Sequence, residues 1–123
     1  MSARILIVDD SLVIRKQVAK ALTGAGYAII EAVDGVDALE KLTSNAETRL
    51  VVCDVNMPRM SGLEFLEELR ARSSAVAVVM LTTESQPDLI QRAKALGARG
   101  WLLKPFKADP LIATAKKLAP ATL

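Results

Sequence analysis

The chain has 123 residues, of which 51% are hydrophobic and 24% are charged, and its formal net charge is +2. This size and composition are typical of one folded domain and exclude a disordered chain, while the small net charge gives no indication of nucleic-acid binding. No apolar run is long enough to cross a bilayer, and the start MSARILIVDD lacks the regions of a signal peptide, so we expect a cytoplasmic protein without membrane insertion.

Five short apolar runs, most of them rich in β-branched residues, predict β-strands. They are, in chain order, Ile5–Val8, Tyr27–Ala32, Leu50–Cys53, Val76–Leu81 and Trp101–Leu103. Helical patterns lie between and after these runs, and the residues expected at or near the helix starts are Ser11, Asp34, Ser61, Ser85 and Asp109. We expect Pro87 in the first turn of the fourth helix and Pro110 at the first position of the fifth.

The alternation of five strands with five helices predicts an α/β fold, a doubly wound five-stranded parallel sheet covered by helices on both faces. Ligands of such sheets bind beyond the carboxyl ends of the strands. Three carboxylates, a hydroxyl and an ammonium group are expected there, and together they predict a site for a divalent cation and a phosphoryl group. They belong to Asp9, Asp10, Asp54, Thr82 and Lys104.

Four segments at these strand ends resemble the receiver domains of two-component response regulators. They are VDDS, CDVNMPRMSG, MLTTES and the KPF of WLLKPF. The resemblance extends over the whole chain, residues 1–123, and implies the flavodoxin-like (CheY-like) strand order 2-1-3-4-5. The short form and the local sequences DVNMP and TTES are most similar to the chemotaxis-type, single-domain regulators.

This resemblance implies that Asp54 accepts a phosphoryl group from a histidine kinase. Lys104 is expected to stabilise the charge of the phosphoryl group during transfer, and Thr82 to donate a hydrogen bond to it afterwards. We therefore expect no enzymatic turnover of external substrates, but a phosphoacceptor that promotes its own phosphorylation and dephosphorylation. A cis peptide bond between Lys104 and Pro105 is implied as well.

The resemblance also implies a bound Mg²⁺ or Mn²⁺ ion, which suits an oxygen-rich site. Asp10, Asp54 and the main-chain carbonyl of Asn56 are expected to ligate it directly, with Asp9 behind them, acting through a water. Asn56 and Glu84 occupy two variable positions that tune the loss of the phosphoryl group in the family.

The implied output is a protein-binding surface on the fourth helix, the fifth strand and the fifth helix. Trp101 occupies the position of the switch aromatic residue, where Tyr or Phe is commoner. Basic residues dominate from Gln91 onward, which we interpret mainly as a solvated helical surface and secondarily as a surface for an acidic partner. No DNA-binding domain follows the last helix in this sequence, so we expect protein partners and no nucleic acid. The residues expected on the output surface are Ile90, Lys94, Ala98, Trp101 and Lys107.

Several alternatives stay open from the sequence alone. A phosphate sink, a phosphorelay intermediate or a receiver excised from a longer regulator would carry the same motifs. A haloacid-dehalogenase-like phosphatase also forms an aspartyl phosphate, but its nucleophile follows the first strand in a DxD pattern, whereas Asp9 and Asp10 are adjacent here. A flavin- or nucleotide-binding domain would need a Gly-rich loop after the first strand, which the sequence lacks.

Overall fold

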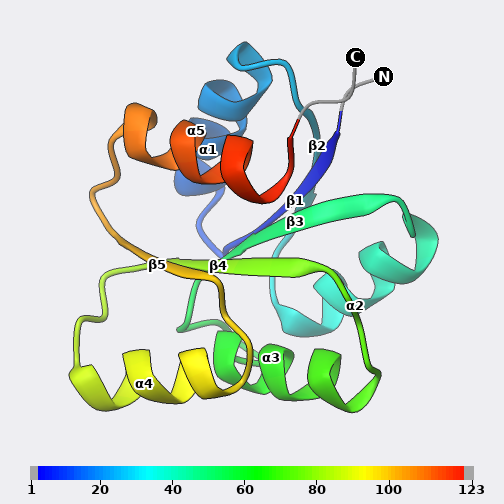
Figure 1. Ribbon diagram of the computed structural model, residues 1–123, viewed down its shortest axis with the longest axis vertical. Helices are drawn as coiled ribbons and strands as arrows, with labels where there is room; N and C mark the ends of the chain where they lie inside the picture. The colour runs from blue at the N-terminus through cyan, green and yellow to red at the C-terminus, as the bar shows by residue number, and fades with distance from the viewer. Residues whose placement is uncertain (1–2, 121–123) are drawn as a thin grey trace.

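A five-stranded parallel sheet forms the centre of the computed structural model, which describes residues 3–120 (Figure 1). The strand order is β2-β1-β3-β4-β5, and every neighbouring pair is parallel. Both the doubly wound sheet and its implied order 2-1-3-4-5 are therefore confirmed. The strands are β1 (Arg4–Val8), β2 (Ala28–Ala32), β3 (Thr48–Cys53), β4 (Ala77–Thr82) and β5 (Gly100–Leu103).

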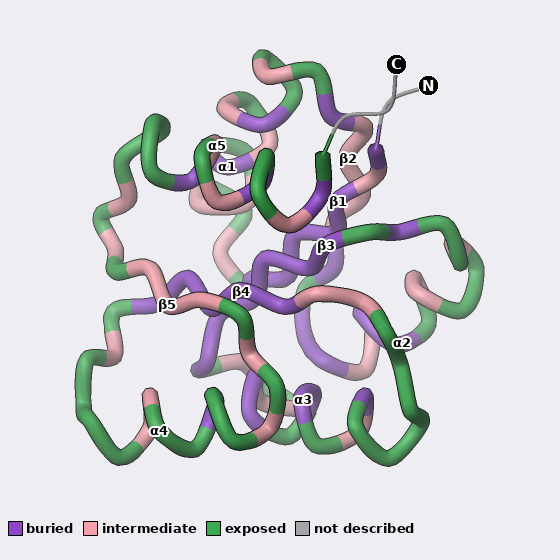
Figure 2. The backbone as a smooth tube through the Cα atoms, viewed as in Figure 1, coloured by how far each residue is buried: buried purple, intermediate pink, exposed green. Residues whose placement is uncertain are grey.

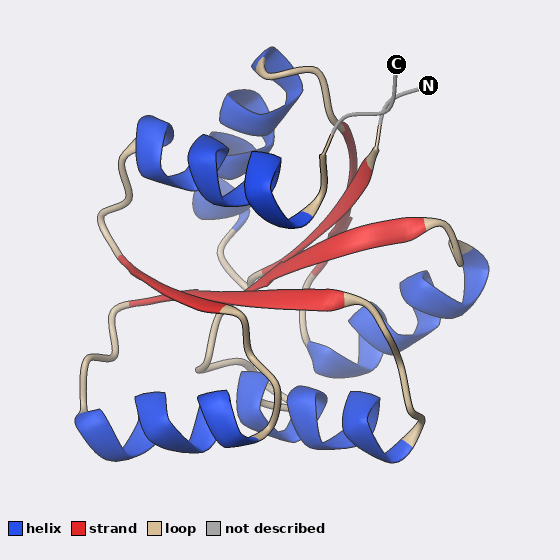
Figure 3. Ribbon diagram, in the orientation of Figure 1, coloured by secondary structure: helices blue, strands red, loops and turns tan. Residues whose placement is uncertain are grey.

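Helices cover both faces of the sheet, two on one side and three on the other (Figure 3). α1 and α5 share one face, and α2, α3 and α4 share the opposite one. Among residues 3–120, none of these helices combines the length and the apolar character that a membrane crossing requires. The helices are α1 (Leu12–Gly24), α2 (Gly35–Ser44), α3 (Gly62–Ala71), α4 (Pro87–Ala95) and α5 (Ala108–Leu118).

The three central strands, β1, β3 and β4, are mostly buried, because helices cover both sides of the sheet (Figure 2). Successive strand side chains point to opposite faces, so Ile5 and Ile7 pack with the α1 and α5 side, while Leu6 and Val8 pack with the α2 to α4 side. The sheet is therefore a rigid platform, and its polar residues are confined to the strand ends.

Three of the predicted helix starts are confirmed as caps. The side chains of Ser11, Asp34 and Ser61 each accept a hydrogen bond from a backbone N–H in the first turn of α1, α2 and α3. Ser61 and Glu64 form a reciprocal capping box. Asp34 and Ser61 thereby fix where α2 and α3 begin, close to the loop that follows β3.

The predicted start of α4 at Ser85 is wrong. The helix begins at Pro87, with Gln86 as its N-cap residue in an extended conformation. A residue that precedes proline is disfavoured in the α-region, because the proline ring contacts its backbone, so the helix cannot begin earlier.

The predicted cap of α5 is wrong as well. The N-cap residue is Lys107, and Asp109 lies within the first turn instead of preceding it. Pro110 is compatible with that turn, since the first N–H groups of a helix have no partner in the helix. Asp109 still stabilises the helix start, because its negative charge is attracted to the positive end of the helix dipole.

Candidate functional site

The carboxyl ends of β1 and β3 bring the three predicted carboxylates together. Val8 pairs with Cys53 in the sheet, so Asp9 and Asp54 follow at the same level, and the Asp54 N–H donates to the Val8 carbonyl at 2.9 Å. Asp9, Asp10 and Asp54 each place one carboxylate oxygen within 4.8 Å of the others. Three negative charges at this spacing repel each other, and a cation beside them offsets this repulsion.

Lys104, at the end of β5, supplies one such cation. Its Nζ donates to Asp9 Oδ2 at 2.7 Å and to Asp54 Oδ2 at 3.0 Å, and its side chain is only 13% exposed. Burial opposes the charge of Lys104, but the hydrogen bonds to the two carboxylates outweigh it and raise the pKa of the lysine. The ammonium group is therefore charged at neutral pH. The implied cis peptide bond between Lys104 and Pro105 is present.

The three carboxylates differ in how far they are already satisfied by the protein. Asp9 is buried, and its Oδ1 accepts a hydrogen bond from the Ser11 N–H at 2.9 Å. Burial raises the pKa of Asp9, although Lys104 and the Ser11 N–H favour its charged form. Asp54 Oδ1 accepts from the Val55 N–H at 2.7 Å. Asp10 is exposed, and within residues 3–120 its carboxylate has no hydrogen-bond partner, so it is the most available ligand of the three.

Asn56 lies in the loop after Asp54, two residues further along the chain. Within the described part of the chain, no N–H group donates to the Asn56 carbonyl. The Asn56 side chain is engaged elsewhere, because its Nδ2 donates to Glu84 Oε1 at 2.7 Å. The main-chain oxygen is thus the part of Asn56 that can serve a metal ion, in line with its expected role.

Thr82 and Trp101 are both hydrogen-bonded to the main chain of Glu84, in the loop after β4. Thr82 is buried, and its Oγ1 accepts from the Glu84 N–H at 3.2 Å. The Trp101 Nε1–H donates to the Glu84 carbonyl at 2.9 Å. Glu84 therefore joins the two predicted switch residues, a link that sequence reasoning missed. The half-buried indole N–H, which needs a partner, was the available signal.

Arg15 is a second residue that sequence reasoning missed. Its Nη1 donates to the Asp9 carbonyl at 2.7 Å, and its Nε donates to Glu31 Oε1 at 3.1 Å. Glu31 lies in β2, next to β1, and it accepts from Lys16 as well. This network fastens the backbone that carries the acidic pair, and it gives the end of β2 a role that the sequence did not indicate.

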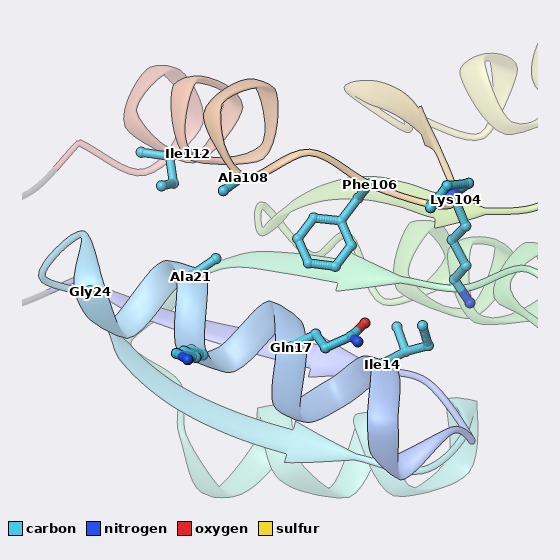
Figure 4. Close-up of a pocket in the computed structure, with 10 residues that line it drawn as sticks. Ile14, Gln17, Ala21, Gly24, Lys104, Phe106, Ala108 and Ile112 are labelled. Atoms are coloured by element: carbon cyan, nitrogen blue, oxygen red, sulfur yellow. The ribbon is translucent and has the colours of Figure 1, made fainter.

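An open groove of about 760 Å³ lies beside the acidic cluster, between α1 and the segment that connects β5 to α5 (Figure 4). Ile14, Phe106 and Ile112 give it apolar walls. The stem of Lys104 lines one end of the groove, while its ammonium group reaches the carboxylates. Lys104 thus connects this groove with the acidic cluster, because its charged end is directed at Asp9 and Asp54.

Known proteins that are similar in sequence and fold identify the family of this chain. Chemotaxis protein CheY1 of Helicobacter pylori is 37% identical over 111 residues, which are 88% of this chain and 90% of that protein. The crystal structure of the chemotaxis protein CheY4 of Vibrio cholerae is 42% identical, with a TM-score of 0.88, and covers 96% of this chain and 99% of its own. CheY in the CheX–CheY–BeF₃–Mg²⁺ complex of Borrelia burgdorferi is 26% identical, with a TM-score of 0.88, over 94% of this chain and 87% of that one. Residues 5–116 match the family described as the response regulator receiver domain, and the chain belongs to this family of two-component signalling proteins.

Proposed function

We propose that residues 1–123 form one receiver domain that accepts a phosphoryl group from a histidine kinase on Asp54 and signals by protein contact in chemotaxis. The observation that carries this proposal is the Lys104 ammonium group held between Asp9 and Asp54 at the strand ends. The relatives CheY1 and CheY4, both named as chemotaxis proteins, support the pathway.

The residues at the site fit a divalent cation. Three carboxylates with oxygens within 4.8 Å of each other, beside an unbonded main-chain carbonyl, form the hard oxygen donor set that Mg²⁺ and Mn²⁺ prefer. Asp10, Asp54 and the Asn56 carbonyl would hold the ion directly, and Asp9 would act through a water. When bound, the ion would offset the repulsion between the carboxylates and stabilise negative charge on the phosphoryl group.

Asp54 is the nucleophile in this proposal. A carboxylate oxygen of Asp54 forms a bond to phosphorus while the bond from phosphorus to the donor breaks, and the donor keeps the electron pair. The Val55 N–H at 2.7 Å and Lys104 at 3.0 Å hold the carboxylate in one orientation. The raised pKa of Lys104 keeps a positive charge beside the phosphoryl oxygens.

The same residues make the domain active in its own phosphorylation and dephosphorylation, without turnover of external substrates. Loss of the phosphoryl group requires a water to approach phosphorus from the open side of the site. The hydrogen bond between the Asn56 and Glu84 side chains lies across two loops that border this side. It therefore adjusts the phosphoryl lifetime in our proposal.

The output surface is the second part of the proposal. Four of the expected residues, Ile90, Lys94, Ala98 and Trp101, line one small hollow of about 70 Å³ between α4 and β5. Lys94 and Lys107 are exposed as expected, whereas Ile90, Ala98 and Trp101 are half-buried. Ala98 and Trp101 also pack against the core. A largely apolar hollow whose lining includes the basic residues Lys94 and Arg99 suits an acidic protein segment. The CheX–CheY complex is an assembly of two proteins and supports a protein partner for this chain.

Phosphotransfer profiling against the histidine kinases of the source organism tests the proposed function. We expect rapid transfer from a chemotaxis-type kinase, followed by tighter binding of a partner. A phosphate sink would accept the phosphoryl group with no change in partner affinity, and a relay intermediate would pass it on to a second histidine protein.

We expect the Asp10→Asn variant to weaken Mg²⁺ binding by at least about tenfold, because it removes a charged ligand from the ion. Asn56→Ala should weaken it by only about twofold or less, since residue 56 contributes its main chain and the substitution leaves that carbonyl in place. Calorimetric titration with MgCl₂ measures both effects. Equal losses in the two variants would contradict the assigned ligand roles.

Trp101 should report activation through its link to Glu84. If Thr82 turns toward a phosphoryl group, its hydroxyl leaves the Glu84 N–H, and the peptide unit that binds the indole shifts. Adding beryllofluoride with Mg²⁺ should therefore change the fluorescence of Trp101, and Thr82→Ala should suppress much of that change. Thr83→Ala is the matched control, because its exposed neighbouring hydroxyl makes neither contact. Unchanged wild-type spectra and solvent quenching would rule out Trp101 as the switch residue.

A further inference from the structure

Asp34 is a buried carboxylate outside the phosphorylation site. It is 2% exposed and caps α2, with its Oδ1 accepting from the Asp37 N–H at 2.9 Å. Both of its oxygens also accept from Arg59, at 2.7 Å from Nε and 3.2 Å from Nη2. Burial opposes the charge on Asp34, but Arg59 and the Asp37 N–H outweigh it and lower the pKa of the carboxylate. The result is a two-pronged ion pair between α2 and the loop after Asp54.

Arg59 holds a backbone conformation that arginine rarely adopts. Its φ is 63°, in the left-handed region, where a side chain crowds the backbone and strains it. Such a conformation persists only where other contacts fix it. The fork on Asp34 is the contact that Arg59 makes here, and it offsets the strain.

Further contacts hold the same loop against α2. The Gly35 N–H donates to the Met60 carbonyl at 3.2 Å, and a Cβ at Gly35 would lie 2.6 Å from Met60 Cγ. The base of the loop is closed by the Gly62 N–H, which donates to the Val55 carbonyl at 2.8 Å. The start of α2 therefore touches the loop directly, beside α3 on the same face of the sheet (Figure 1).

Asn56 lies in the loop between Val55, which is bonded to Gly62, and Arg59, which is bonded to Asp34. Only two residues separate it from Arg59, so the ion pair restricts how far its carbonyl can move. We propose that the Asp34–Arg59 ion pair is a positioning device that holds the Asn56 carbonyl in place for the divalent cation. This inference rests on the proposed function, because it takes the metal site from there. Among residues 3–120, the hydrogen bonds of the Arg59 side chain go to Asp34 and not to the carboxylates of the cluster, so Arg59 acts through the loop.

Two variants test the pair without removing other structure. Arg59→Gly deletes the fork but allows the same left-handed backbone. Asp34→Asn removes the charge but keeps a good helix cap. We expect each to raise the dissociation constant for Mg²⁺, measured by calorimetry without phosphodonor, by about three- to fivefold. The double variant should be no weaker than either single variant, because both remove one interaction.

The matched control is Arg72→Ala, which breaks an exposed ion pair with Glu68 at 2.9 Å on α3 and should leave Mg²⁺ affinity unchanged. Phosphorylation by acetyl phosphate gives a second readout. In the Arg59 and Asp34 variants, half-saturation by Mg²⁺ should rise by the same factor, while the maximal rate at saturating Mg²⁺ stays near that of the wild type.

Wild-type Mg²⁺ affinity in Arg59→Gly, together with a lower free energy of unfolding, would overturn the inference and leave the pair a structural one. If the wild type binds Mg²⁺ and is phosphorylated, and the variants bind Mg²⁺ as tightly as the wild type, this inference alone is overturned. A wild-type protein that binds no Mg²⁺ overturns both the inference and the metal site of the proposed function.

Discussion

The Asp54→Asn variant is expected to lose phosphorylation by acetyl phosphate and by any histidine kinase, with a fall in rate of at least about 10³-fold. An amide oxygen is a poor nucleophile, and the substitution also removes a negative charge from the position that Lys104 contacts and that the proposed metal ion would contact. Intact-mass spectrometry after incubation with acetyl phosphate and Mg²⁺ should show one added phosphoryl group on the wild type and none on the variant.

Asp88→Asn is a suitable control for this experiment, because it removes the same charge from an exposed position in α4. It should be labelled like the wild type. Undiminished labelling of Asp54→Asn would contradict the assignment. An adduct on Asp9 or Asp10 would instead favour the phosphatase alternative, in which the nucleophile follows the first strand.

The acidic cluster could be predicted because it depends on the order of elements alone. Parallel strands present all their carboxyl ends at one edge of the sheet, so polar residues that end separate strands must meet there. Asp9, Asp54 and Lys104 are far apart in the chain, and their convergence still follows from this rule. The lengths of the apolar runs located the strands accurately enough for this rule to be applied.

The contacts that hold the cluster could not be predicted in the same way. Arg15 reaches Glu31 on a neighbouring strand, and Arg59 reaches Asp34 at the start of another helix. Many exposed charges lie close enough in sequence to offer similar pairs, and only packing selects among them. The left-handed backbone of Arg59 has no sequence signal either, since glycine is the residue normally expected there.

The helix starts also fall into two groups, those that the sequence predicts and those that it does not. Ser11 and Ser61 cap their helices through bonds to the next turn, which is a local effect that sequence reveals. The starts of α4 and α5 have no capping side chain, and they are set by the conformations that residues around Pro87 and Pro110 can adopt. Proline therefore marked both helices correctly but located their first residues inaccurately.

Gly62→Ala is expected to damage both the fold and the site. A Cβ at Gly62 would lie 2.2 Å from the Asp54 carbonyl oxygen and 3.0 Å from Val55 Cα. These are backbone atoms of the segment that holds the phosphoacceptor, so they cannot move aside as a flexible side chain could. Overpacking of this kind should lower the free energy of unfolding by about 3 kcal/mol, measured by urea denaturation.

Helix propensity alone predicts the opposite sign. Alanine is favoured over glycine within helices by about 1 kcal/mol, and Gly62 is the first residue of α3. The steric cost is larger than the gain in helix propensity, so we expect Gly62→Ala to be destabilised.

Gly24→Ala is the control, because Gly24 ends α1 with no heavy atom within 4 Å of the added Cβ, and this variant should be neutral or slightly stabilised. Folded Gly62→Ala protein should also be phosphorylated more slowly than the wild type at saturating Mg²⁺, because the backbone of Asp54 has to shift. Wild-type stability and phosphorylation in Gly62→Ala would mean that the loop after Asp54 does not pack against α3 as described.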